Sequence, residues 1–200
     1  MSSNALWSRI KQASGPIWGA LAAGLIATGA FTVSFATAPG PTGLLGGVLA
    51  ILVAAIATID LRSFTIPDWL NASAFGLALI NAALLDPDAL RWAIASALAR
   101  SFTVAALFLL IRVAYFYVRG RQGVGLGDIK LAAVAGAWLD WLMLPLAVEL
   151  AAFTAVSVYL FRGVVLRQQV GGTTRVPFGA FFAPAIWICW FFQMSSSPMM

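Results

Sequence analysis

The 200-residue sequence is too apolar for a water-soluble protein, because 62% of its residues are hydrophobic and only 10% are charged, against about 25% charged in typical soluble domains. It has a net charge of +5 but no His, and its basic residues lie singly between apolar runs, which argues against nucleic-acid binding. The single Cys189 excludes a disulfide framework and a paired-Cys zinc site. We therefore expect an integral membrane protein that is embedded in the lipid bilayer and needs no metal and no cofactor.

Apolar runs follow one another along almost the whole chain. A helix needs about 20 apolar residues to cross the hydrocarbon core, and most of the runs approach that length. The sequence therefore predicts an all-α, polytopic transmembrane bundle of about seven spans (six to seven) in a single domain, residues 1–200. We interpret the first run as a retained span and residues 1–16 as a polar, cytoplasmic segment. The runs cover residues 17–37, 42–59, 69–86, 90–118, 126–140, 142–161 and 176–194.

Positive charges between the runs indicate the orientation, because cytoplasmic loops are enriched in Lys and Arg. All of them can be cytoplasmic if 126–140 and 142–161 are two helices joined by a tight outer turn. The N-terminus is then cytoplasmic and the protein lies in the cytoplasmic (inner) membrane. The short 126–140 helix, roughly 22 Å long, is tolerable if other helices surround it. The basic residues are Arg9, Lys11, Arg119, Arg121, Lys130, Arg162, Arg167 and Arg175.

Three acidic residues lie at predicted cytoplasmic ends of spans. Asp60 ends an apolar run and is either a functional acid or a boundary residue held by Arg62. Asp128 opens the 126–140 helix after a glycine-rich stretch that permits unusual dihedrals and close backbone approach, although a plain helix cap beside Lys130 is the alternative. Asp68 follows Pro67, and we expect it mainly to cap the next helix.

Asp60 and Asp128 are both predicted at the inner membrane surface, where acids are functional candidates. Two carboxylates brought close together share one proton and titrate as a pair. The ionised member can take a proton from water while the protonated member polarises a peptide carbonyl. This pair therefore predicts metal-free aspartyl protease chemistry.

An alternative hypothesis rests on the charged residues inside the predicted spans. Glu149 and Arg100 lie at similar predicted depths and could form an ion pair that relieves two buried charges, or contact water separately. If they matter most, the protein is a small transporter or channel component that uses acids for proton or cation transfer. Arg112 is close enough to a span end to extend its charge to the interface. A further alternative is a non-catalytic assembly factor, but the presence of both Asp60 and Asp128 argues against it.

Three segments resemble motifs of the type IV prepilin peptidases. Asp60-Leu-Arg-Ser-Phe-Thr-Ile-Pro-Asp68-Trp-Leu-Asn71 resembles the first aspartate motif of that family, and Gly125-Leu-Gly-Asp128-Ile-Lys-Leu131 resembles its second, GxGD motif. Val176-Pro-Phe-Gly179 resembles an element near the family's C-terminus. The resemblance covers roughly residues 45–190, and the paired motifs are more specific than either alone.

The resemblance implies a GxGD aspartyl endopeptidase that removes the basic leader of prepilins or pseudopilins at the cytoplasmic face, usually after a Gly, in pilus assembly or protein secretion. It implies Asp60 and Asp128 as the catalytic pair. Larger members carry a methyltransferase domain, often with paired CxxC motifs, and we expect this chain to lack that activity, like the compact enzymes of tight-adherence pili. The oligomeric state is left open. The implied supporting or substrate-proximal residues are Ile66, Pro67, Asp68, Gly125, Gly127 and Lys130.

Overall fold

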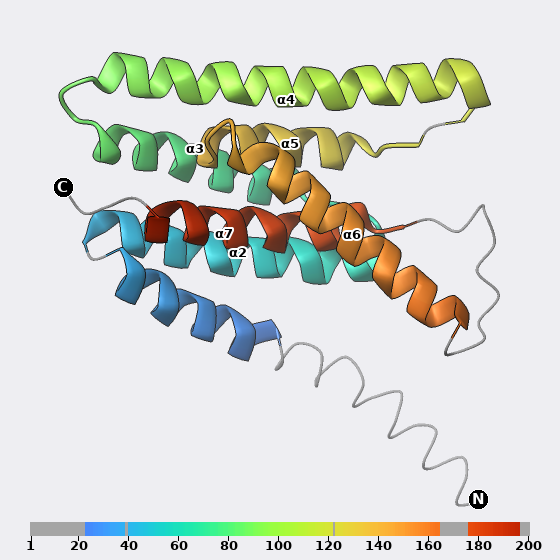
Figure 1. Ribbon diagram of the computed structural model, residues 1–200, viewed down its shortest axis with the longest axis horizontal. Coiled ribbons are helices and arrows are strands. Elements are labelled where there is room, and N and C mark those ends of the chain that lie inside the picture. The colour runs from blue at the N-terminus through green and yellow to red at the C-terminus, as the bar shows by residue number, and fades with distance from the viewer. Residues whose placement is uncertain (1–22, 39, 122, 165–175, 197–200) are drawn as a thin grey trace, which may run out of the picture.

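The computed structural model describes residues 23–38, 40–121, 123–164 and 176–196, and in these ranges every regular element is a helix (Figure 1). The segment 1–16, the start of the first predicted span and the basic residues Arg9, Lys11, Arg167 and Arg175 lie outside the described residues. The helices are Ala23–Thr37, α2 Pro41–Ser63, α3 Asp68–Leu85, α4 Leu90–Arg119, α5 Leu126–Trp138, α6 Met143–Val164 and α7 Phe178–Ser196.

The predicted all-α, multi-pass membrane fold is confirmed. In the described part of the chain, α2, α3, α4, α6 and α7 are long and apolar enough to cross a membrane, whereas Ala23–Thr37 and α5 are shorter. The predicted hairpin is also correct, because α5 ends at Trp138 and α6 begins at Met143, whose N–H donates to Asp140 O at 3.0 Å across the turn. The side of the membrane on which each end lies stays a prediction.

The short helix α5 lies inside the bundle, in contact with α3, α4 and α7 (Figure 1). Its sequence is rich in Ala and Gly, which lets neighbouring backbones come close. A Cβ on Gly136 would lie 2.6 Å from Ser101 Cα on α4. On another face, Trp138 donates its indole N–H to Ala74 O of α3 at 2.9 Å. The surrounding helices thus cover a helix that is too short to span the bilayer by itself, as its length predicted.

Another part of the core lies where α7 packs against α2 and α6. The ring of Trp190 fills the space beside Gly46, where an added Cβ would lie 1.7 Å from the ring, and it meets Trp138 edge-on at 6.1 Å. On α6, Ala147, Ala151 and Ala155 are buried, and this helix packs against α7. The core is therefore held by close contacts between small residues and a few large aromatic rings.

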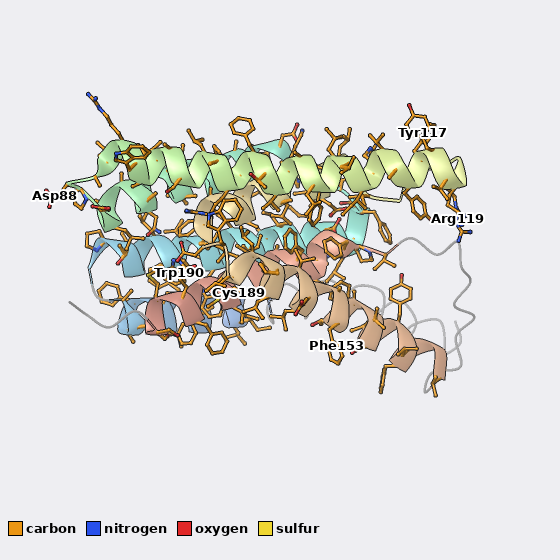
Figure 2. All side chains as sticks on the ribbon, turned by 45° about the horizontal axis from the view of Figure 1, so that its top comes forward. Asp88, Tyr117, Arg119, Phe153, Cys189 and Trp190 are labelled. Atoms are coloured by element: carbon orange, nitrogen blue, oxygen red, sulfur yellow. The ribbon has the colours of Figure 1, made fainter. Side chains whose placement is uncertain are left out.

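The outer surface is apolar along the middle of the helices. Phe153 on α6 is 75% exposed and projects away from the bundle, whereas Cys189 and Trp190 lie inside it (Figure 2). Charged side chains such as Asp88 and Arg119 lie at opposite ends of α4 (Figure 2). Exposed apolar side chains in this number are what a surface covered by lipid requires.

Candidate active site

The end of α2, the start of α5 and the start of α7 meet at one end of the bundle. Asp60, in the last turns of α2, is 5% exposed, and its Oδ2 accepts a hydrogen bond from the main-chain N–H of Ala180 at 2.9 Å. The first N–H groups of a helix have no partner within the helix and favour a negative charge. The start of α7 thus stabilises a carboxylate that α2 buries.

Asp128 occupies the first turn of α5, and its Oδ2 accepts a hydrogen bond from the N–H of Gly125 at 3.2 Å. The main chain of Gly179 interacts with the carboxyl groups of both Asp60 and Asp128, and the charge of Asp60 acts on Asp128. The two acids, which are far apart in the sequence, therefore belong to one site.

Both carboxyl groups open into a cavity of about 280 Å³. Every site residue predicted from the sequence lines it except Pro67, which instead forms the extended connection before α3, with φ −62° and ψ 134°. Its mixed polar and apolar wall can hold water beside a peptide group. The lining residues are Asp60, Phe64, Thr65, Ile66, Asp68, Gly125, Leu126, Gly127, Asp128 and Lys130.

Ile66 packs between two glycines that flank the acids. It is 8% exposed, and a Cβ added to Gly127 would lie 3.2 Å from Ile66 Cβ, while one added to Gly179 would lie 2.6 Å from Ile66 Cδ1. Neither glycine has a positive φ. Close approach, rather than an unusual dihedral, is therefore the reason for glycine at both positions, and Ile66 connects the α2–α3 turn to the starts of α5 and α7.

The turn that carries Ile66 begins with Phe64, which adopts a left-handed conformation at φ 53° and donates its N–H to Asp60 O at 2.9 Å. A left-handed residue ends a helix by satisfying a terminal carbonyl. The main chain of Asp60 thus closes α2 while its side chain faces the cavity.

Asp68 does not cap α3, contrary to our prediction. The helix begins at Asp68 itself, after Pro67, and no side chain caps its first turn. The Asp68 carboxylate instead accepts a hydrogen bond from Lys130 Nζ at 2.6 Å, in an ion pair whose side chains are 75% and 50% exposed. This contact links the start of α3 to the first turns of α5 at the rim of the cavity.

The suggested Arg100–Glu149 pair is also wrong. Among the described residues the ion pair is Lys130–Asp68, and Arg100 donates from Nε to Gly136 O at 3.1 Å. Glu149 is exposed on α6, which packs against α7. The charge of Arg100 is thus met by the main chain of α5 and not by Glu149.

Sequence reasoning missed two contacts at the site. Val176–Gly179 was noted only for its resemblance, although the N–H of Ala180, the next residue, donates to Asp60. We also expected Arg112 to extend toward the interface, whereas Arg112 is half-buried and donates to Val124 O. The available signal was the charge itself, because an Arg inside an apolar helix needs a polar partner.

The electrostatics of Asp128, which lies outside the five long apolar helices, favour a retained proton. Burial raises the pKa of Asp128 to about 6, opposed by the hydrogen bond from Gly125 and assisted by the charge of Asp60. A carboxyl with this pKa is protonated for part of the time near neutral pH, as one member of a proton-sharing pair must be.

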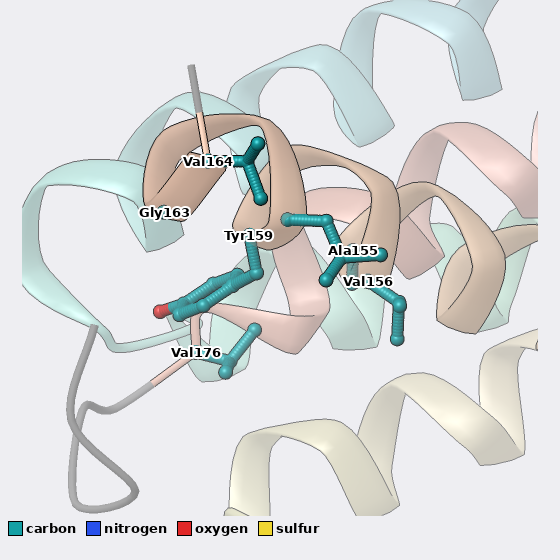
Figure 3. Close-up of a pocket in the computed structure, with 7 residues that line it drawn as sticks. Ala155, Val156, Tyr159, Gly163, Val164 and Val176 are labelled. Atoms are coloured by element: carbon teal, nitrogen blue, oxygen red, sulfur yellow. The ribbon is translucent and has the colours of Figure 1, made fainter. Parts of the chain in front are cut away.

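A larger groove of about 380 Å³ lies where α6 passes the residues before α7 (Figure 3). None of its lining side chains is acidic or basic, and Tyr159 has the one polar side chain among them. By contrast, two carboxyl groups, those of Asp60 and Asp128, line the smaller cavity. The groove is lined by Ala155, Val156, Tyr159, Leu160, Gly163, Val164 and Val176.

Comparison with known proteins gives a consistent family. The model of the Type IV leader peptidase family matches residues 47–160. The chain is 30% identical over 156 residues to a prepilin leader peptidase/N-methyltransferase of Aeromonas hydrophila, covering 78% of this chain and 52% of that protein. It is 30% identical over 126 residues to the leader peptidase HopD of Escherichia coli, covering 63% of this chain and 78% of that protein.

A third relative is a prepilin leader peptidase/N-methyltransferase of Pseudomonas putida, 40% identical over 104 residues, which covers 51% of this chain and 32% of that protein. The chain thus spans about half the length, or less, of these two prepilin leader peptidase/N-methyltransferase relatives. No solved structure matches.

Proposed function

The chain belongs to the type IV leader peptidase family, and on that premise we propose that it is a membrane-embedded aspartyl endopeptidase with Asp60 and Asp128 as its catalytic pair. One observation carries the proposal: both carboxyl groups line a single cavity, and the main chain of Gly179 interacts with both. Such a pair can hold one proton between two acids.

Hydrolysis by this pair needs only water and the two side chains. The ionised carboxylate takes a proton from a water molecule, whose oxygen attacks the scissile carbonyl carbon, while the protonated carboxyl donates to the carbonyl oxygen. The tetrahedral intermediate then collapses as the C–N bond breaks and the amine leaves with a proton from the pair. The N–H of Ala180, which donates to Asp60, and the N–H of Gly125, which donates to Asp128, hold the two carboxyl groups in place for these steps.

The substrate that fits this arrangement is a prepilin or pseudopilin, which has a basic leader followed by an apolar helix. That helix can lie in the bilayer beside the bundle, which leaves the scissile bond near the ends of α2, α5 and α7. We propose that these ends lie at the cytoplasmic face of the inner membrane, because α4 ends with Arg119, shortly before Arg121. The end of α4 lies at the same end of the molecule as the end of α2 and the starts of α5 and α7 (Figure 1).

We further propose that these residues remove the leader without methylating the new N-terminus. The support comes from the amino-acid composition. These residues include one Cys and so no paired CxxC motif, which often accompanies the methyltransferase domain in larger members of the family. A product of unmodified mass supports this part of the proposal, and a product heavier by one methyl group rejects it while leaving proteolysis intact.

The test is to co-express the chain with a tagged prepilin in cells without another leader peptidase and to determine the mass of the product. We expect a shortened prepilin with the wild-type chain and full-length prepilin with the Asp60→Asn/Asp128→Asn double variant. Asp88→Asn is the matched control, because Asp88 is an exposed acid at the far end of α4. Full-length prepilin with the inserted wild-type chain would reject the proposal.

A further inference from the structure

One peptide group connects a basic residue to a catalytic acid. The carbonyl oxygen of Val124 and the N–H of Gly125 belong to the same peptide unit. Arg112 on α4 donates from Nη1 to Val124 O, and the N–H of Gly125 donates to Asp128 Oδ2 at 3.2 Å. The peptide unit is therefore held at both ends, by a guanidinium on its oxygen and by a carboxylate on its N–H.

We propose that Arg112 is a positioning residue that acts on Asp128 through the Val124–Gly125 peptide group. This inference rests on the proposed peptidase function. A cation at the oxygen of a peptide group polarises it and makes its N–H a stronger donor, because linked hydrogen bonds reinforce one another. The stronger donor favours the ionised form of Asp128 and fixes the direction of its carboxylate.

The location of Arg112 supports this role. Its side chain is half-buried, in a helix that is otherwise apolar on both sides of it, and a charge there is costly unless it has a strong partner. Gly125 has φ −72° and ψ 152°, which is ordinary extended backbone, so the peptide does not need a special conformation to make both bonds. The arrangement fixes the loop before α5 to the neighbouring helix α4.

Other charged groups near Asp128 set the background for a test. Asp60 acts on it directly, and the Lys130–Asp68 ion pair lines the same cavity. Loss of the Arg112 contact weakens the hydrogen bond to the carboxylate, so the pair should retain its shared proton to higher pH. The pH–rate profile should consequently move to higher pH, which a purely structural role would not produce.

The experiment measures kcat, KM and the pH profile of kcat/KM with purified protein in detergent and a purified prepilin. For Arg112→Gln we expect about a tenfold lower kcat, little change in KM, and a profile displaced to higher pH. Arg112→Lys keeps a charged donor and should restore most of the wild-type profile. Arg119→Gln removes the same charge from the exposed end of the same helix and should leave the profile unchanged.

A second pair of variants tests the hydrogen bond between the Gly125 N–H and Asp128. It replaces the first test if Arg112→Gln does not fold. Gly125→Pro removes the N–H donor, and its φ suits proline. Gly125→Ala is the matched control, because it adds a Cβ near Asp128 Oδ2, as proline also does, but keeps the N–H. We expect the profile of Gly125→Pro to lie at higher pH than that of Gly125→Ala.

The outcomes separate this inference from the proposed function. Absence of cleavage by the wild-type chain would reject the proposed function itself. Cleavage by the wild-type chain, with Arg112→Gln keeping the wild-type pH profile, would reject the role of Arg112 alone. Equal displacement by Arg112→Lys and Arg112→Gln, or equal profiles for Gly125→Pro and Gly125→Ala, would also reject it.

Discussion

The carboxylate of Asp60 and the N–H of Ala180 are joined by a 2.9 Å hydrogen bond, which fixes the end of α2 against the start of α7. The residue before Ala180 is Gly179, whose missing side chain makes this contact possible. A Cβ there would lie 3.0 Å from Asp60 Oδ2 and 2.6 Å from Ile66 Cδ1. The geometry of the acid thus depends on the space beside one glycine.

Substitution of Gly179 by Ala should impair cleavage without preventing insertion. The added methyl group must displace Ile66 or the Asp60 carboxylate, and overpacking of this kind costs about 1–3 kcal/mol. We expect the cleavage rate to fall about tenfold or more. Gly76→Ala on α3 is the control, since nothing lies within 4 Å of an added Cβ there, and it should cleave at the wild-type rate.

The cause of that loss can be tested by shortening the neighbouring side chain. Ile66→Val or Ile66→Ala in the Gly179→Ala background makes room for the new methyl group, and we expect part of the activity to return. Rates should be compared at equal amounts of inserted protein. If no shortening of Ile66 restores any activity, the packing of Ile66 against Gly179 is not what holds the site in place.

The cleavage rate should depend on pH with a falling limb on the alkaline side. Burial raises the pKa of Asp128 to about 6, so that its proton is lost as pH rises through that region, and with it the acid that donates to the scissile carbonyl. The apparent value belongs to the pair of acids. A pH–rate profile of kcat/KM measures it, and a rate that continues to climb well above that pH would contradict the shared proton.

The Lys130–Asp68 ion pair should contribute little to activity. Its side chains are 50% and 75% exposed, and exposed pairs are typically worth about 0–1 kcal/mol. Asp68→Asn is therefore expected to cleave within about fivefold of wild type, and Lys130→Gln similarly. Complete loss of cleavage in Asp68→Asn, with normal insertion, would place Asp68 in the catalytic machinery.

Removal of divalent metal ions should leave cleavage unchanged, because the proposed mechanism uses two carboxyl groups and water alone. The sequence has no His, and in the described ranges no three side chains of His, Cys, Asp or Glu come together. The measurement is cleavage by purified protein before and after incubation with a chelator. Inhibition that is reversed by adding a divalent cation would overturn the metal-free mechanism.

Much of the fold could be predicted because the helices follow directly from hydrophobicity. The 90–118 run became α4, Leu90–Arg119, and the predicted turn between 126–140 and 142–161 lies between Trp138 and Met143. The positive-charge pattern was informative here, since it favoured two helices over one. The acids Asp60 and Asp128 were predicted from their motifs and from their places at the ends of apolar runs, and both line one cavity.

Contacts between distant segments could not be predicted, because no pattern in one segment specifies its neighbour. Arg100 and Glu149 were paired on depth alone, yet depth does not say which faces of α4 and α6 meet. The role of the Ala180 N–H could not be predicted either, because every residue except proline has a main-chain N–H. Nor could the packing of Ile66, which is the reason that glycine occupies positions 127 and 179. Helix ends are predictable, whereas the partners of side chains require the packed structure.

The most direct test of the catalytic pair compares prepilin cleavage by Asp60→Asn, Asp128→Asn and the double variant at equal levels of inserted protein. Because residues that act as one unit are strongly non-additive, we expect each single variant to have no more activity than the double variant. Substantial cleavage by either single variant would show that the two carboxyl groups do not act together.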